Sequence, residues 1–184
     1  MDRRLEAVLA ELGRAVGSVD PAEADRLCEA LAGERRIVVA GCGRERLQLN
    51  GFAMRLFHMG LDVSIAGDVF AHRVGPGDLV LVTSGPGELP TMRTIMQLAK
   101  AAGATVFVIT AQAGSTAARE AEDLLVIPAQ TMADDQDGTA RSVLPMGSVF
   151  EGALFVLFEL MVMKLRERLD IGFDAMRARH ANLE

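Results

Sequence analysis

Two glycine-rich turns carry the residues whose types and spacing are best suited to chemistry in this sequence. One spans residues 41–44 and follows the apolar run 37–40, and the other spans residues 84–88 and follows the apolar run 79–83. Each turn precedes an amphipathic segment, so the pattern predicts a strand, a turn and a helix twice. Such a turn leaves backbone N–H groups free at a helix N-terminus, where the helix dipole favours an anion. Two such turns in one sheet predict a cleft for a phosphorylated ligand at the carboxyl ends of parallel strands.

Glu151 is the carboxylate best suited to act as a general base, because its neighbours Phe150, Ala153 and Leu154 are apolar. Burial among such residues would raise the pKa of its carboxyl group towards a useful range. The alternative is structural: a glutamate in the first turn of a helix is stabilised by the helix dipole. From the residues alone, both interpretations stay open.

The histidines and Cys42 also have structural alternatives. His58 falls in the last turn of a predicted helix, where a cation is favoured, and His180 lies five residues from the end of the sequence. His72 falls in a loop. Nucleophilic chemistry at Cys42 would require a nearby base, which the sequence does not identify. Taken singly, each of these residues is more often structural than catalytic.

Several common nucleotide and metal motifs are incomplete. Gly41-x-Gly43 has Arg46 where a dinucleotide fingerprint has its third glycine, and no P-loop lysine follows either turn. The acidic run at 134–138 lacks the first and twelfth ligands of a calcium loop, since Ala133 and Leu144 stand there. We therefore expect neither dinucleotide binding, nor hydrolysis of a nucleoside triphosphate, nor a metal site.

Composition and charge limit the class of partner. The chain of 184 residues has a net charge of −6 and no Trp or Tyr, which argues against a nucleic-acid partner. The N-terminus mixes charges and lacks the apolar core of a signal peptide, and the two cysteines form no disulfide framework, so we expect a cytoplasmic protein. The apolar segment 146–163 is interrupted by Glu151 and Glu159, which indicates a buried or subunit-interface helix rather than a membrane span.

The alternation of apolar runs and amphipathic segments predicts an α/β fold with helices on both faces of a parallel sheet. We expect strands near 36–40, 62–66, 78–83, 105–110 and 124–127, and helices near 2–17, 20–32, 45–59, 88–102, 115–121, 147–168 and 173–181. One irregular loop spans 129–142. The whole chain, 1–184, is expected to form one domain, with N-terminal helices at 1–33, an α/β core at 34–168 and a helical tail at 169–184.

Several of these segments together resemble the sugar isomerase (SIS) domain family, and more narrowly its 6-phospho-3-hexuloisomerases. The likeness lies in residues 41–44, 51–60, 73–78, 84–88, 144–151 and 178–184, in that order. It implies a three-layer α/β/α, flavodoxin-like fold with a five-stranded parallel sheet and extra terminal helices. It also implies a homotetramer or homodimer that converts 3-hexulose 6-phosphate to fructose 6-phosphate without a metal or organic cofactor.

The resemblance also implies a role for each candidate residue. Glu151 would be the base that moves a proton between adjacent carbons, and His58 and His180 would handle protons at the oxygens, with His180 from a neighbouring subunit. The phosphorylated sugar would be bound by residues of both turns, namely Gly41, Cys42, Gly43, Arg44, Ser84, Gly85, Gly87 and Glu88.

The turns depart from the family pattern at four positions. Cys42 and Glu45 replace serines, Pro86 replaces a serine and Leu89 replaces a threonine. Such hydroxyls are worth roughly 1.5–3 kcal/mol each as hydrogen bonds to a phosphate. Two alternatives to the leading isomerase hypothesis therefore stay open: a non-catalytic module that senses a sugar phosphate, and an isomerase with a changed substrate.

Overall fold

A five-stranded, entirely parallel sheet forms the centre of the fold. The computed structural model describes residues 2–33, 36–135 and 142–183. The sheet order is β2-β1-β3-β4-β5, with β1 at Ile37–Ala40, β2 at Val63–Ile65, β3 at Leu79–Thr83, β4 at Thr105–Thr110 and β5 at Asp123–Val126. The chain order reverses between β1 and β3, and this is where ligands bind in open parallel sheets.

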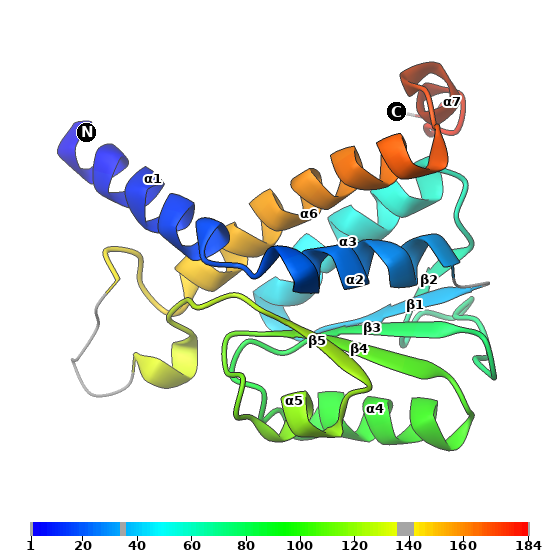
Figure 1. The fold of residues 1–184 in the computed structure, drawn as a ribbon, viewed down its shortest axis with the longest axis horizontal. Coiled ribbons are helices and arrows are strands. Elements are labelled where there is room, and N and C mark those ends of the chain that lie inside the picture. The colour runs from blue at the N-terminus through cyan, green and yellow to red at the C-terminus, as the bar shows by residue number, and fades with distance from the viewer. Residues whose placement is uncertain (1, 34–35, 136–141, 184) are drawn as a thin grey trace.

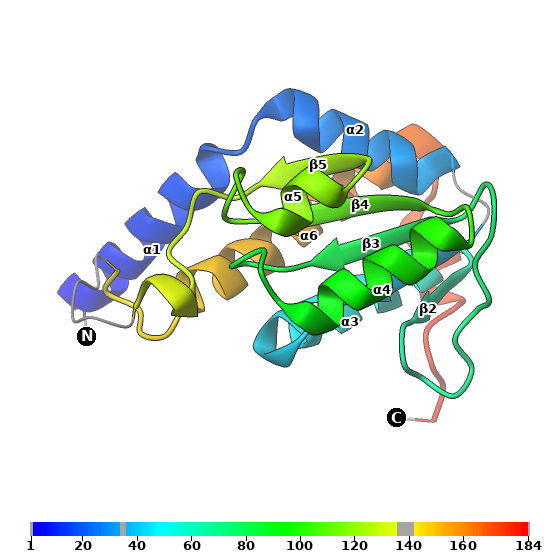
Figure 2. The same cartoon turned by 90° about the horizontal axis from the view of Figure 1, so that it is seen from below.

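Helices cover both faces of this sheet, which confirms the predicted three-layer arrangement. One face carries α1 (Asp2–Gly17), α2 (Pro21–Gly33), α3 (Gly43–His58) and α6 (Ser148–Leu169), as Figure 1 shows. The opposite face carries α4 (Pro90–Ala101) and α5 (Thr116–Glu120), which lie in front of the strands in Figure 2. The short helix α7 (Phe173–Arg177) follows α6 beyond the far end of α3.

The three central strands, β1, β3 and β4, are mostly apolar because both of their faces are buried. Leu79 and Leu81 of β3 belong to the core under α3 and α6, whereas Val80 and Val82 belong to the core over α4. All four side chains are at most 1% exposed. Side chains alternate between the two faces of a strand, so a strand covered on both sides becomes a continuous hydrophobic run.

Helix α6 is apolar on most of its faces because α1, α2 and α3 all pack against it. Its Phe158 stacks on Phe52 of α3, with ring centroids 4.3 Å apart. The outer face is nevertheless not covered within one chain, since several large apolar side chains of α3 and α6 are about half exposed: Met54, Phe57, Phe155, Leu160 and Met163. Among the described residues, no helix has the length and hydrophobicity needed to cross a membrane.

Two segments differ from the sequence-based expectation. The expected irregular loop contains a 3-10 helix, η1 (Met132–Asp134), because Thr131 and Asp134 cap it reciprocally. The Thr131 hydroxyl donates to an Asp134 carboxylate oxygen at 2.8 Å, and residues 136–141 of that loop lie outside the described residues. The last helix ends at Arg177 rather than near 181.

Candidate active site

The N-termini of three helices meet in one cleft at the carboxyl ends of β1 and β3. The cleft has a volume of about 510 Å³. Its walls come from the segments that begin α3, α4 and α6, together with the loop before and within η1: Cys42, Gly43, Arg44, Glu45, Pro86, Glu88, Leu89, Thr131, Met132, Ala133, Met146, Gly147, Phe150 and Glu151. Each helix N-terminus carries about half a positive charge, so this convergence favours an anion.

The predicted phosphate-binding residues divide into two groups. Cys42, Gly43, Arg44 and Glu88 line the cleft. Gly41, Ser84, Gly85 and Gly87 form the backbone behind its walls and are buried or half-buried. A Cβ on Gly41 would lie 2.6 Å from the Thr83 hydroxyl oxygen, so this glycine allows the first turn to approach β3 closely. The Ser84 hydroxyl is fully buried and has no hydrogen-bond partner among the described residues.

Gly87 is required by the second turn for two separate reasons. Its φ is +71°, and an added Cβ would lie 2.1 Å from the Ser115 hydroxyl oxygen. Ser115 cannot move away freely, because its hydroxyl caps α5 by accepting the N–H of Ala118 at 3.2 Å. The turn that begins α4 is thus held against the turn that begins α5.

We expect Gly87→Ala to lower the free energy of unfolding by at least about 2 kcal/mol, through backbone strain and overpacking combined. Chemical denaturation would measure the loss. Gly114→Ala is the matched control, because a Cβ at Gly114 meets no atom within 4 Å and its φ is not positive. Equal stability of the two variants would contradict this account of the turn.

Glu151 stands at the wall of the cleft, next to Arg44. The Arg44 Nε atom lies 3.0 Å from Glu151 Oε2, and Arg44 Nη1 donates to the Ser148 hydroxyl at 3.0 Å. The Glu151 side chain is 13% exposed, whereas that of Arg44 is 61% exposed. Burial raises the pKa of the Glu151 carboxyl, and the Arg44 charge opposes that rise. The carboxylate is therefore largely desolvated while still bordering the cleft, which suits a base.

Glu45 is a second carboxylate in the same cleft, and sequence reasoning identified it only as a departure from the family pattern. Both of its carboxylate oxygens accept the backbone N–H of Gly85, at 3.1 Å each. Burial raises the pKa of Glu45 to about 7, the Gly85 hydrogen bond opposes the rise, and the charge of Glu151 adds to it. The Glu45 side chain, which directly follows the first turn, thus occupies a backbone N–H donor of the second turn.

The two candidate histidines lie together, but away from Glu151 within one chain. His58 is the last residue of α3, and α3 has 16 residues and is therefore about 24 Å long. The rings of His58 and His180 have centroids 5.2 Å apart, and Arg179 Nη1 donates to the His58 carbonyl oxygen at 3.3 Å. His72 contacts Asp62, with 2.7 Å between Nε2 and Oδ1.

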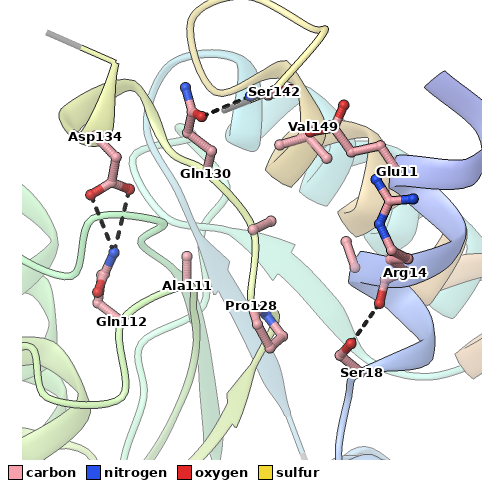
Figure 3. A pocket seen from close by; sticks show the side chains of 12 residues that line it. Glu11, Arg14, Ser18, Ala111, Gln112, Pro128, Gln130, Asp134, Ser142 and Val149 are labelled. Atoms are coloured by element: carbon pink, nitrogen blue, oxygen red, sulfur yellow. Dashed lines mark hydrogen bonds between the residues drawn. The ribbon is translucent and has the colours of Figure 1, made fainter. Parts of the chain in front are cut away.

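A larger cavity of about 630 Å³ lies between α1 and the ends of β4 and β5 (Figure 3). Its polar groups mostly bond to one another: the amide of Gln112 donates to Asp134 at 3.3 Å, and Gln130 accepts the N–H of Ser142 at 3.0 Å. None of the residues of the two turns lines it. Among the described residues, no group of three or more His, Cys, Asp or Glu side chains could hold a metal ion. The cleft with Glu45 and Glu151 is therefore the better candidate site.

Comparisons with known proteins agree with one another on what this chain is similar to. The SIS domain matches residues 30–154. A Bacillus subtilis protein named 3-hexulose-6-phosphate isomerase is 32% identical, over 96% of this chain and 95% of its own length. A Mycobacterium gastri protein of the same name is 35% identical, over 98% and 89%. The crystal structure of a Methanococcus jannaschii protein, from which that same function was inferred, has a TM-score of 0.85 at 22% identity and covers 99% of both chains.

Proposed function

This chain belongs to the SIS domain family, and from that membership we propose that it converts 3-hexulose 6-phosphate to fructose 6-phosphate through an enediol. One observation carries the proposal: a desolvated carboxylate, Glu151, lines a cleft at which three helix N-termini converge. Such a cleft offers an anion site and a base within one small volume. The proposed substrate is taken from the relatives named 3-hexulose-6-phosphate isomerase, which match this chain over most of their own length.

The chemistry moves a carbonyl from C3 to C2 of the sugar. In the proposed reaction the Glu151 carboxylate takes the proton from C2, which gives an enediol shared by C2 and C3, and returns that proton to C3. The hydroxyl proton on O2 is transferred to O3 at the same time, so the atoms balance. Arg44, in contact with Glu151, is the cation positioned to stabilise negative charge on the enediol oxygens.

We assign the transfer of the proton from O2 to O3 to His58 and His180 of a neighbouring copy. Within one chain these histidines lie at the opposite end of α3 from the cleft. The exposed apolar side chains along α3 and α6 support such an assembly, since a large apolar patch on a protein surface commonly marks an interface. The oligomer proposed is a homotetramer or homodimer.

Deuterium exchange tests this function directly. Fructose 6-phosphate incubated with the protein in D2O is expected to gain deuterium at C3, which proton NMR follows without knowledge of the equilibrium product. Binding without any exchange would instead favour the second candidate, a module that senses a sugar phosphate. The specific observation in favour of that candidate is that Glu45 already occupies the Gly85 N–H.

The Pro86→Ser, Leu89→Thr double variant is expected to bind fructose 6-phosphate at least about tenfold more tightly. Both side chains line the cleft beside the start of α4, and each new hydroxyl could donate to a phosphate oxygen, worth roughly 1.5–3 kcal/mol. Calorimetry would measure the Kd. Leu98→Thr, on the exposed face of α4, is the control for the change of residue type. An unchanged Kd would contradict a phosphate position at this turn.

A further inference from the structure

The second turn has few N–H groups to offer an anion. Pro86 has none, and the Gly87 N–H donates to the Ser84 carbonyl oxygen at 3.0 Å. The Gly85 N–H therefore remains as the donor within residues 85–87, and it is bound by both oxygens of the Glu45 carboxylate. A phosphate that approached residues 85–87 would therefore meet an anionic group of the chain itself.

We propose that Glu45 makes sugar-phosphate binding proton-linked: the phosphate occupies the second turn only as the Glu45 carboxylate takes up a proton. This inference rests on the proposed function, since it requires a phosphorylated ligand in the same cleft. It makes Glu45 a specificity-determining residue, because a ligand without a phosphate would bring no second negative charge next to this carboxylate.

Packing opposes the alternative in which the ionised carboxylate merely swings away. Glu45 Oε1 is only 2.9 Å from the position that a Cβ on Gly85 would take, so the carboxylate lies directly against the turn, beside the Phe150 ring. A side chain held in this way would leave Gly85 only by moving into the cleft. Glu151, Glu88 and the incoming phosphate are all anionic there.

The charges around Glu45 favour protonation over displacement. Glu151 faces it from α6 and raises the cost of its ionised form, while Arg44, its neighbour on α3, is paired with Glu151. Glu88, before α4, directs its carboxylate at the backbone N–H of Thr116, which it accepts at 2.7 Å. A protonated Glu45 removes one negative charge and gains an O–H that can donate to a phosphate oxygen.

The expected pH dependence follows from the same contacts. Burial raises the pKa of Glu45 to about 7 in the free protein, so above pH 7 its carboxylate is mostly ionised and must take up a proton when the ligand binds. Affinity then falls as pH rises, by about tenfold for each pH unit above that pKa. Below pH 7 this dependence disappears, and only the second ionisation of the phosphate, near pH 6, remains.

Calorimetry of fructose 6-phosphate binding at pH 8 tests the proposal, in two buffers with different ionisation enthalpies so that proton uptake is counted. The native protein is expected to take up about one proton, and Glu45→Gln, which is isosteric and uncharged, to take up none and bind about tenfold more tightly. Glu29→Gln is the matched control, since it removes the same charge from an exposed side chain on α2. If Glu45→Gln fails to fold, the number of protons that the native protein takes up on binding decides the test by itself.

Three outcomes are distinguishable. Tighter binding without proton uptake in Glu45→Gln alone supports the proposal. Equal affinity in all three proteins, with no proton uptake by the native protein, overturns it and leaves the proposed isomerase function intact. No binding of fructose 6-phosphate by the native protein or by Glu45→Gln between pH 6 and pH 8.5 overturns both this inference and the proposed function.

Discussion

Glu151→Gln is expected to lower both the isomerase turnover and the deuterium exchange at C3 by at least about a hundredfold, the usual contribution of a positioned general base. Glutamine keeps the size and the hydrogen-bonding oxygen of the side chain but cannot accept the carbon-bound proton. The Kd for fructose 6-phosphate is expected to change little, because the phosphate position that we propose is at the helix N-termini rather than on Glu151. Loss of kcat without loss of binding is the signature of a group that acts on the reacting atoms.

Glu159→Gln is the matched control for this experiment. It lies two turns further along α6, where its carboxylate contacts Arg55 at 3.5 Å outside the cleft. It removes the same charge from the same helix and is expected to keep the native exchange rate. If Glu151→Gln retained that rate as well, the base would have to be another group, and Glu45 is the other desolvated carboxylate of the cleft.

The fold was predictable because its signals are local. The apolar runs at 37–40 and 79–83 are β1 and β3, and the glycine-rich turns after them do begin α3 and precede α4. A strand buried on both faces is apolar at nearly every position, and glycine in a tight turn allows backbone conformations and close approaches that other residues do not. The flavodoxin-like arrangement of the five strands was implied only by the family resemblance, and their register was not predicted, since no local pattern encodes which strands pair.

The contact between Glu45 and Gly85 could not be predicted in the same way. The two residues are 40 positions apart, and their meeting depends on the separation of β1 and β3 and on one side-chain rotamer. From the sequence, Glu45 was a charged residue where the family has serine and was expected to bring negative charge towards the phosphate, but neither its burial nor its partner could be predicted. Its charge, burial and partner become visible together only when both turns are placed at one edge of the sheet.

The C-terminal tail also differs from expectation. The sequence predicted a helical tail at 169–184, whereas its helix α7 ends at Arg177. In the structure Arg179 lies over Gly60, and His180 lies beside His58, at the end of α3. The tail thus organises the pair of histidines that the family resemblance assigned to one reaction, although both are remote from the base of their own chain.

Co-assembly of two inactive variants is therefore expected to restore activity. One variant is Glu151→Gln, and the other lacks residues 178–184 and so lacks His180. Each alone is expected to lose at least about a hundredfold in turnover, because each lacks one of the groups that move protons. If the cleft of one copy receives the histidines of another, random mixing makes about a quarter of all sites complete, and about half of the sites in a mixed dimer.

The two variants would be produced together with different affinity tags, and mixed oligomers purified on both tags before assay. Native mass spectrometry would verify that the shortened chain still assembles, which is expected because the exposed apolar side chains of α3 and α6 are retained. Mixed oligomers without restored turnover would contradict a site shared between copies. So would a native protein that runs as a monomer at micromolar concentration and is fully active, since Glu151 and the two histidines then lie near opposite ends of α3 in the only copy present.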